Sequence, residues 1–145
     1  MSHKERDFAR RIRQQGYRFT PQRQLILDAL CGLGGHATVD EIYEVVNATA
    51  PSINLATVYR TVRFLEELRL VVSADIQGQT VYEIAQPTPH HHLVCRECGD
   101  VQVLGDEHLQ ELAATLAREH QFQAELDHMA ISGLCAGCQT EQDEA

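Results

Sequence analysis

The sequence contains no long apolar run. Its longest apolar stretches are only a few residues long, far short of the roughly 20 residues that a helix needs to cross a bilayer. The first residues, MSHKERDFARR, also lack the apolar core of a secretory signal. We therefore expect a cytoplasmic protein that has no membrane partner.

The chain has five cysteines, and a reducing compartment disfavours their use in disulfides. Four of the five cysteines form two CxxC pairs, Cys95 with Cys98 and Cys135 with Cys138. Each pair places two thiolates on a tight turn, as a tetrahedral four-sulfur zinc site requires. We predict a structural Zn²⁺ that joins two distant strands around an intervening helix. The remaining Cys31 is predicted to be a small buried hydrophobe.

Basic residues are outnumbered, with 12 Lys and Arg against 21 Asp and Glu and a net charge of -9. As an average, this charge argues against nucleic acid as a partner. The distribution is uneven, however, because residues 1–72 carry ten basic and eight acidic residues, whereas residues 73–145 carry two and thirteen. Such a split is typical of a DNA-contacting half joined to a metal-binding half.

Four helices are predicted in the first half of the chain. A basic helix spans about 5–15, a second starts after the N-cap Thr20, a third follows the capping box of Thr38 and Glu41, and a fourth carries Val58, Val62, Leu65 and Leu68 on one stripe. Two extended segments, 70–74 and 80–84, flank a turn at Gly78. Helices followed by a two-stranded hairpin predict a winged helix-turn-helix.

A break in the pattern at residues 86–89, QPTP, marks a domain boundary, because proline continues neither a helix nor a central strand. We expect a DNA-binding domain in residues 1–85 and a smaller α/β dimerisation domain, stapled by zinc, in residues 90–145. The second domain is predicted to hold a strand with HHHLVC, a helix over 106–120, a final strand reaching the second CxxC, and a frayed acidic tail from residue 139. The fold class is α+β.

A histidine tract provides a second candidate metal site. On a strand, alternate side chains share a face, so His90 and His92 point together while His91 points the other way. Glu83 at the end of the hairpin and His36 in a glycine-rich loop could add a carboxylate and a third imidazole. A mixed nitrogen and oxygen set suits Fe²⁺, Mn²⁺, Zn²⁺ or Ni²⁺, and the order of affinities does not choose among them.

The fourth helix is the expected recognition helix. Its polar stripe offers Thr57 and Arg60 for base or phosphate contacts, with Tyr59 for packing on thymine methyl groups. Arg18 and Arg23 flank the start of the second helix, where they could reach phosphates or a minor groove. A solvated helix face is the alternative interpretation of any single arginine.

Three motifs together resemble the ferric uptake regulator (Fur) superfamily: GYRFTPQR at 16–23, NLATVYRT at 54–61 and HHHLVCRECG at 90–99. The resemblance covers about residues 8–138. It implies a homodimer whose winged helices bind palindromic operators when a sensory metal is loaded. By position, it implies structural zinc on the four paired cysteines, a regulatory metal on His36, Glu83, His90 and His92, and DNA contacts from Arg18, Tyr59 and Arg60.

Some positions depart from the family pattern. Val103 stands where many iron and peroxide sensors carry an acidic ligand, so the regulatory site here has four expected protein ligands. A third family site would use His91 and His128, but Pro89 and Gln110 occupy positions where its other ligands are frequent. Zinc sensing is disfavoured because no spare cysteine lies near Glu83, and peroxide sensing because aspartate is usual at that position.

The predicted function is therefore a metal-dependent, DNA-binding transcriptional repressor that responds to iron and takes no small organic substrate. Zinc-, manganese- or peroxide-responsive relatives are the alternatives within the family. A zinc hydrolase or a thiol oxidoreductase is the alternative from another class, although a closed four-thiolate site offers neither an open metal position nor a general base. A zinc-dependent protein-interaction module is a third possibility.

Overall fold

The computed structural model describes residues 3–34 and 37–143. The chain divides into two compact units. The first contains the residues up to 73 together with 80–85, and the second contains 74–79 and the residues from 86 onward. The tip of the hairpin thus groups with the second unit.

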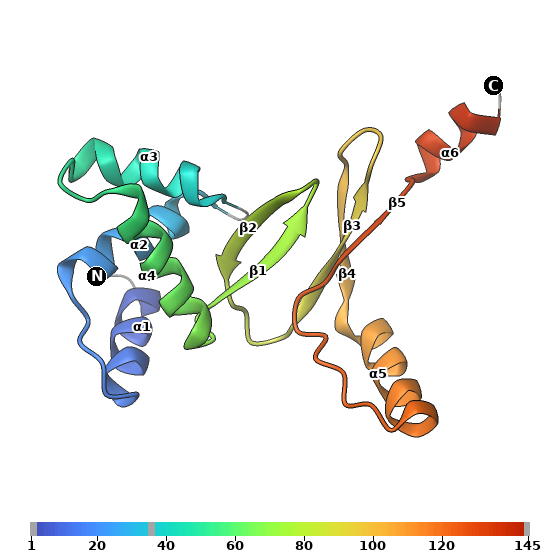
Figure 1. Ribbon diagram of the computed structural model, residues 1–145, viewed down its shortest axis with the longest axis horizontal. Helices are drawn as coiled ribbons and strands as arrows, with labels where there is room; N and C mark the ends of the chain where they lie inside the picture. The colour runs from blue at the N-terminus through green and yellow to red at the C-terminus, as the bar shows by residue number, and fades with distance from the viewer. Residues whose placement is uncertain (1–2, 35–36, 144–145) are drawn as a thin grey trace. The chain divides into compact units, whose positions relative to one another are not determined.

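Four helices and the base of a hairpin make up the first unit (Figure 1). The helices are α1 (His3–Gln14), α2 (Pro21–Gly32), α3 (Val39–Thr49) and α4 (Leu55–Glu67), and the hairpin consists of β1 (Val71–Ile76) and β2 (Gln79–Ile84). Gly78 adopts a positive φ of 79° in the turn between the strands, a conformation that glycine reaches without steric cost. This order of elements confirms the winged helix-turn-helix.

Side-chain caps fix where three of these helices begin. The hydroxyl of Thr20 accepts from the backbone N–H of Arg23 at the start of α2, and Asn54 does the same for Thr57 at the start of α4. Thr38 and Glu41 form the full capping box of α3, with both reciprocal hydrogen bonds present. Each cap satisfies backbone donors that have no partner within the helix, typically worth about 1 kcal/mol.

A single apolar core holds the first unit together. Its fully buried side chains come from α1 to α4 and the first strand, and include Ile12, Ile26, Leu30, Ile42, Val58, Val62, Leu65 and Val71. Cys31 does not join them: the prediction that it is buried was wrong, because it lies exposed in the last turn of α2, beyond the buried residues Ala29 and Leu30.

A three-stranded sheet forms the centre of the second unit. Its elements are β3 (His90–Cys95), β4 (Val101–Gly105), α5 (Asp106–His120), β5 (Ala130–Gly133) and α6 (Ala136–Asp143). The strand order is β4-β3-β5, with β3 antiparallel to β4 and parallel to β5. The helix α5 lies on the connection between β4 and β5 (Figure 1), as parallel pairing requires a long crossover.

The parallel pair β3–β5 sets the positions of both candidate metal sites. The pairing keeps a constant offset of 38 residues, from His92 opposite Ala130 to Cys95 opposite Gly133. Carried back along the chain, this offset places His128 beside His90. Carried forward, it brings Cys135 next to the turn that follows Cys95.

The carboxyl end holds a helix that was not predicted. The last strand ends at Gly133, two residues before the second CxxC, and that motif lies at the start of α6. The tail predicted to fray from residue 139 is helical to Asp143. Within α6 the backbone N–H of Gln139 donates to Cys135 O at 3.1 Å, and the Thr140 hydroxyl donates to Gly137 O at 2.7 Å.

Among the described residues, no helix combines the length and the apolar character needed to span a membrane.

Candidate metal centres and nucleic-acid surface

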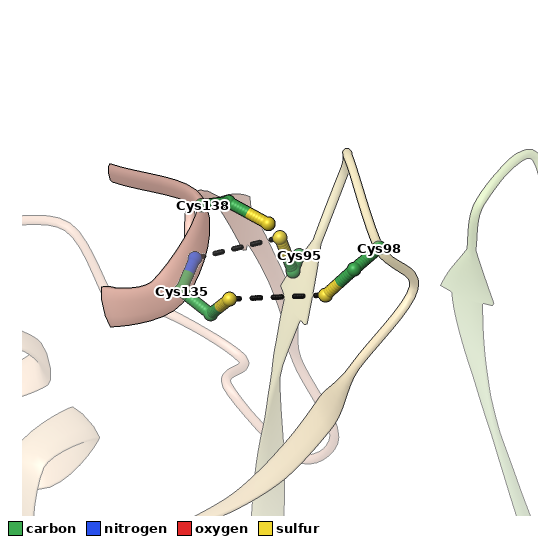
Figure 2. Close-up of side chains that lie close together, drawn as sticks. All are labelled: Cys95, Cys98, Cys135 and Cys138. Atoms are coloured by element: carbon green, nitrogen blue, oxygen red, sulfur yellow. Dashed lines mark hydrogen bonds between the residues drawn. The ribbon is translucent and has the colours of Figure 1, made fainter. Parts of the chain in front are cut away.

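The four paired cysteines come together at the end of the β3–β5 pair (Figure 2). Cys95 ends β3 and Cys98 lies on the following turn, which the Gly99 N–H closes by donating to Cys95 O at 3.0 Å. Cys135 and Cys138 approach from the start of α6. The four sulfur atoms lie within 4.8 Å of one another.

The sulfur geometry fits a tetrahedral zinc ion. Zinc–sulfur bonds of about 2.3 Å in a tetrahedron place the sulfur atoms about 3.8 Å apart. The Sγ atoms of Cys98 and Cys135 are 3.7 Å apart, and none of the four cysteines forms a disulfide. All four donors are thiols, so the set is the closed kind that holds a structural ion and leaves no position for a substrate.

Hydrogen bonds give these thiols unequal acidities. The backbone N–H of Cys135, which donates to Cys95 Sγ at 3.4 Å, is the main cause that lowers the pKa of Cys95 to about 6. The neighbouring Cys135 thiol raises the pKa of Cys138 to about 12. Cys95 is therefore a thiolate at neutral pH and Cys138 is a thiol, because a hydrogen bond to the charged form favours that form.

Three imidazoles converge on the opposite end of the same strand pair. The rings of His90, His92 and His128 have centroids 4.8 to 5.1 Å apart and stand nearly perpendicular to one another. The Nε2 atoms of His92 and His128 are 2.9 Å apart. Nitrogen atoms that approach so closely can share a transition metal, for which neutral imidazole is a favoured ligand.

His91 points to the other face of β3, as the alternation along the strand predicts. Its ring is fully buried. The ring's Nε2 lies 2.8 Å from Asp106 Oδ1, and its Nδ1 accepts from the backbone N–H of Met129 at 3.0 Å. The hydrogen bond from His91 and then that from Gln110 hold the pKa of Asp106 below its ordinary value.

The structure does not bring the side chains of His91 and His128 together, as the third family site would require. The two side chains lie on different faces of the sheet, and His128 contributes to the cluster of His90 and His92 instead. Sequence reasoning missed this grouping, because it depends on a parallel strand pairing. The one available signal is spacing: His128 follows His90 at about the same interval that separates the two CxxC pairs.

The remaining predicted ligands come from the first unit. Glu83 lies near the end of β2 and is buried, with 6% of its surface exposed. His36 lies outside the described residues. Val103 stands where the family pattern leads us to expect an acidic ligand. It pairs with His92 across the β3–β4 ladder and is 71% exposed.

The expected recognition helix α4 presents its polar stripe to solvent. Tyr59 is 49% exposed, Arg60 is exposed, and Thr57 is partly exposed. The guanidinium of Arg60 donates to the Thr57 hydroxyl at 3.3 Å. Together with residues of α2, Thr57 and Arg60 line an open hollow of about 360 Å³, which places cationic and hydroxyl groups where a nucleic-acid backbone can be contacted.

Arg18 and Arg23 behave differently from each other. Arg18 is exposed on the loop before α2. Arg23 donates from Nη1 to the Arg18 carbonyl at 2.5 Å and lies over the Phe64 ring of α4, with 3.9 Å from its guanidinium carbon to the ring centre. The edge of Tyr17 meets the same ring, with the centroids 5.0 Å apart. Arg23 thus connects the loop that carries Arg18 to α4.

Comparison with known proteins agrees with this architecture. The model of the ferric uptake regulator family matches residues 14–132. The ferric uptake regulation protein of Campylobacter jejuni is 30% identical over 93% of this chain and 88% of its own length. The peroxide-responsive repressor PerR of Staphylococcus saprophyticus is 30% identical over 96% of this chain and 94% of its own.

A solved structure of a zinc uptake regulator complexed with zinc and DNA has a similar fold, with a TM-score of 0.69 at 24% identity over 99% of both chains. The family model covers most of the sequence and includes the expected recognition helix, the histidine cluster and the first cysteine pair. The chain therefore belongs to the ferric uptake regulator family, whose members are metal-responsive transcriptional regulators.

Proposed function

We propose that this protein is a dimeric transcriptional repressor that binds operator DNA when a regulatory metal ion is loaded. The observation that carries the proposal is the presence of two preformed donor clusters of different chemistry in one small domain. Four thiols suit a permanent ion, whereas three imidazoles suit an exchangeable one. A protein with this task acts where the DNA is, in the cytoplasm.

The structural zinc ion is assigned to Cys95, Cys98, Cys135 and Cys138. Its fit is supported by the near-tetrahedral sulfur spacing and by the absence of disulfides among the four. When bound, zinc supplies folding energy, because the ligands are brought together only in the folded domain. The thiols would hold the ends of β3 and β5 side by side.

The regulatory ion is assigned to His90 and His92, to which we add His128 as a further imidazole. The support is their convergence within the second unit. Glu83 and His36 are proposed as the ligands contributed by the first unit, on the strength of the family resemblance. Fe²⁺ is the proposed physiological metal, with Zn²⁺ and Mn²⁺ as the competing candidates, since imidazole accepts all of them.

DNA binding is assigned to α4 with Thr57, Tyr59 and Arg60, and to Arg18 on the loop before α2. The exposure of these side chains supports the assignment, as does the solved DNA complex of a family member. Two copies of the chain are needed to read a palindrome. Dimerisation is assigned to the second unit, which exposes the large apolar side chains Val103, Leu112 and Phe122.

Coupling between metal and DNA follows from linkage. Ligands drawn from both units would favour the arrangement in which the DNA-binding units of the two subunits match two operator half-sites. A ligand can shift this equilibrium only by its differential affinity for the two arrangements. The metal effect on DNA affinity is expected to be about 5- to 150-fold, the range usual for coupled sites.

The test is an anaerobic titration of the zinc-containing protein with Fe²⁺, Mn²⁺, Zn²⁺ and Ni²⁺ while binding to a palindromic operator of the family type is recorded. The variant His90→Ala/His92→Ala is expected to bind DNA as weakly as the metal-free wild type at every metal concentration. His108→Ala, which removes an exposed histidine of α5, serves as the matched control. Equal affinity of the wild type with and without the second metal would contradict the proposal.

A further inference from the structure

His91 lies between two proposed metal ligands yet makes a different set of contacts. Its ring is fully buried and faces α5, whereas the neighbouring His90 and His92 face His128. A buried imidazole needs hydrogen-bond partners or a metal to offset its loss of hydration. The partners of His91 therefore decide which role it has.

Both ring nitrogens of His91 are occupied. The backbone N–H of Met129 can only donate, so Nδ1 of His91 is the acceptor in that 3.0 Å contact. The proton of the neutral ring must then be on Nε2, which donates to Asp106 Oδ1 at 2.8 Å. The other oxygen of Asp106 accepts from Gln110 Nε2 at 2.7 Å, one turn further along α5.

These contacts fix the peptide group that follows His128. Met129 is held twice by β3: its N–H donates to the ring of His91, and its carbonyl accepts from the His92 N–H at 2.8 Å. The N–H of Met129 belongs to the peptide plane that begins at His128. Holding that plane sets the direction in which the His128 side chain leaves the backbone.

We propose that His91 is a positioning residue of the regulatory metal centre and not a metal ligand: through Met129 it orients His128, and through Asp106 it ties that orientation to the first turn of α5. The inference rests on the proposed function of the histidine cluster. It also accounts for the failure of His91 and His128 to form a third site, since a metal at His91 would have to break two hydrogen bonds of a buried ring.

The consequence for the centre is an indirect one. Groups that hydrogen-bond around a metal site hold its ligands in place, and their loss typically lowers metal affinity by about 10- to 100-fold. Removing His91 should therefore weaken metal binding at the histidine cluster without lowering the number of metal ions bound per chain at saturation. It should also disturb the ligand geometry, which a general loss of stability would not do.

The experiment uses full-length protein with zinc retained on the cysteines, titrated with Co²⁺, whose d–d absorption reports ligand number and geometry. His91→Leu is expected to bind Co²⁺ about 10- to 100-fold more weakly with a changed d–d spectrum, while total metal per chain at saturation stays at the wild-type value. Asp106→Ala, which leaves β3 untouched, should change affinity and spectrum in the same direction. His108→Leu on the exposed face of α5 is the control.

Nitrogen-15 NMR of the wild type gives an independent measure that needs no variant. His91 is expected to show a neutral ring protonated at Nε2 both before and after a second equivalent of Zn²⁺ is added. A metal-bound shift at either nitrogen, a lost ion in His91→Leu, or unchanged Co²⁺ affinity in both variants would overturn the inference. If the wild type binds no Co²⁺ outside the cysteine site, the proposed function itself fails.

Discussion

Cys95 and Cys138 differ in acidity although they serve the same proposed ion. Cys95 accepts hydrogen bonds from backbone N–H groups, above all that of Cys135, and these stabilise its thiolate. Cys138 faces other cysteine side chains, which destabilise a second negative charge beside the first. At neutral pH the end of β3 therefore offers a thiolate, Cys95, whereas Cys138 of α6 is protonated.

This difference predicts how zinc uptake depends on pH. With a pKa of about 12, Cys138 is protonated at neutral pH and releases its proton when zinc binds. With a pKa lowered to about 6, Cys95 has no proton to release above that pH, and protons compete with zinc for its sulfur only below it. We expect the number of protons released per zinc to rise by about one as the pH falls from 7.5 to 5.

The measurement is proton release on adding zinc to chelator-treated protein whose circular dichroism shows that it is still folded. Cys31→Ser, which alters a cysteine outside the cluster, should give the same curve as the wild type. A release that stays constant across this pH range would show that Cys95 has no special acidity.

Individual residues show what the sequence can and cannot predict. Alternation along a strand correctly separates His91 from His90 and His92, because the rule is local. The grouping of His128 with His90 and His92 was not predicted, because it depends on the parallel pairing of β3 with β5, two segments far apart in the chain. Cys31 was misplaced because helical periodicity does not tell where a core ends along the helix.

At the scale of elements, Phe64 links two parts of the expected DNA surface. One face of its ring stacks under the guanidinium of Arg23, and the ring also meets Tyr17 edge to face. Arg23 in turn holds the carbonyl of Arg18. The loop before α2 is thereby held against α4, the expected recognition helix.

Phe64→Leu is expected to lower the free energy of unfolding by about 1 kcal/mol, since it removes a cation–π contact and an aromatic pair. Operator affinity should fall about threefold to tenfold, because the loop with Arg18 is no longer fixed, while the slope of log affinity against log salt stays unchanged. Arg23→Ala should behave in the same way if Arg23 acts through Phe64.

Urea unfolding and DNA titrations at several salt concentrations provide the two readouts. Arg60→Ala is the comparison, because the loss of a phosphate or base contact by an exposed cation lowers the salt slope. If Arg23→Ala lowers the slope as much as Arg60→Ala does, Arg23 contacts phosphate directly. The interpretation that it acts by holding the loop before α2 against α4 is then wrong.

The elements themselves were largely predictable. The caps at Thr20 and Thr38 are encoded within four residues of sequence, so the starts of α2 and α3 were predicted correctly. Periodicity identified α4 and the hairpin for the same reason. The start of α6 was not predicted, because its sequence AGCQTEQD is polar and shows no apolar stripe.

At the scale of the whole molecule, the exposed apolar side chains of the second unit require an explanation. Val103, Leu112 and Phe122 are 71%, 47% and 60% exposed. Exposed apolar side chains of this size are candidates for burial against another chain. We expect a second copy of this chain to cover them, because the proposed binding to a palindromic operator requires two copies.

Leu112→Glu is expected to weaken the dimer by tenfold or more, about 1.4 kcal/mol, because it places a charge in an apolar contact. Operator binding should weaken in parallel, since a monomer has one DNA-binding unit and makes only half of the contacts. Sedimentation velocity at several protein concentrations measures the first effect. Val45→Glu, at a similarly exposed apolar position of α3, should leave the dimer intact, and a dimer unaffected by Leu112→Glu would place the interface elsewhere.

The last prediction concerns the reciprocity of metal and DNA. If metal at His90, His92 and His128 raises operator affinity by a given factor, operator DNA must raise metal affinity by the same factor, because both factors describe one thermodynamic cycle. Metal titrations with and without saturating operator should therefore give dissociation constants whose ratio equals the ratio of DNA dissociation constants with and without metal. An operator scrambled in sequence, which lacks the half-sites, should produce a smaller shift. A metal affinity that does not respond to operator, in protein whose DNA affinity does respond to metal, would place the controlling ion somewhere other than this histidine cluster.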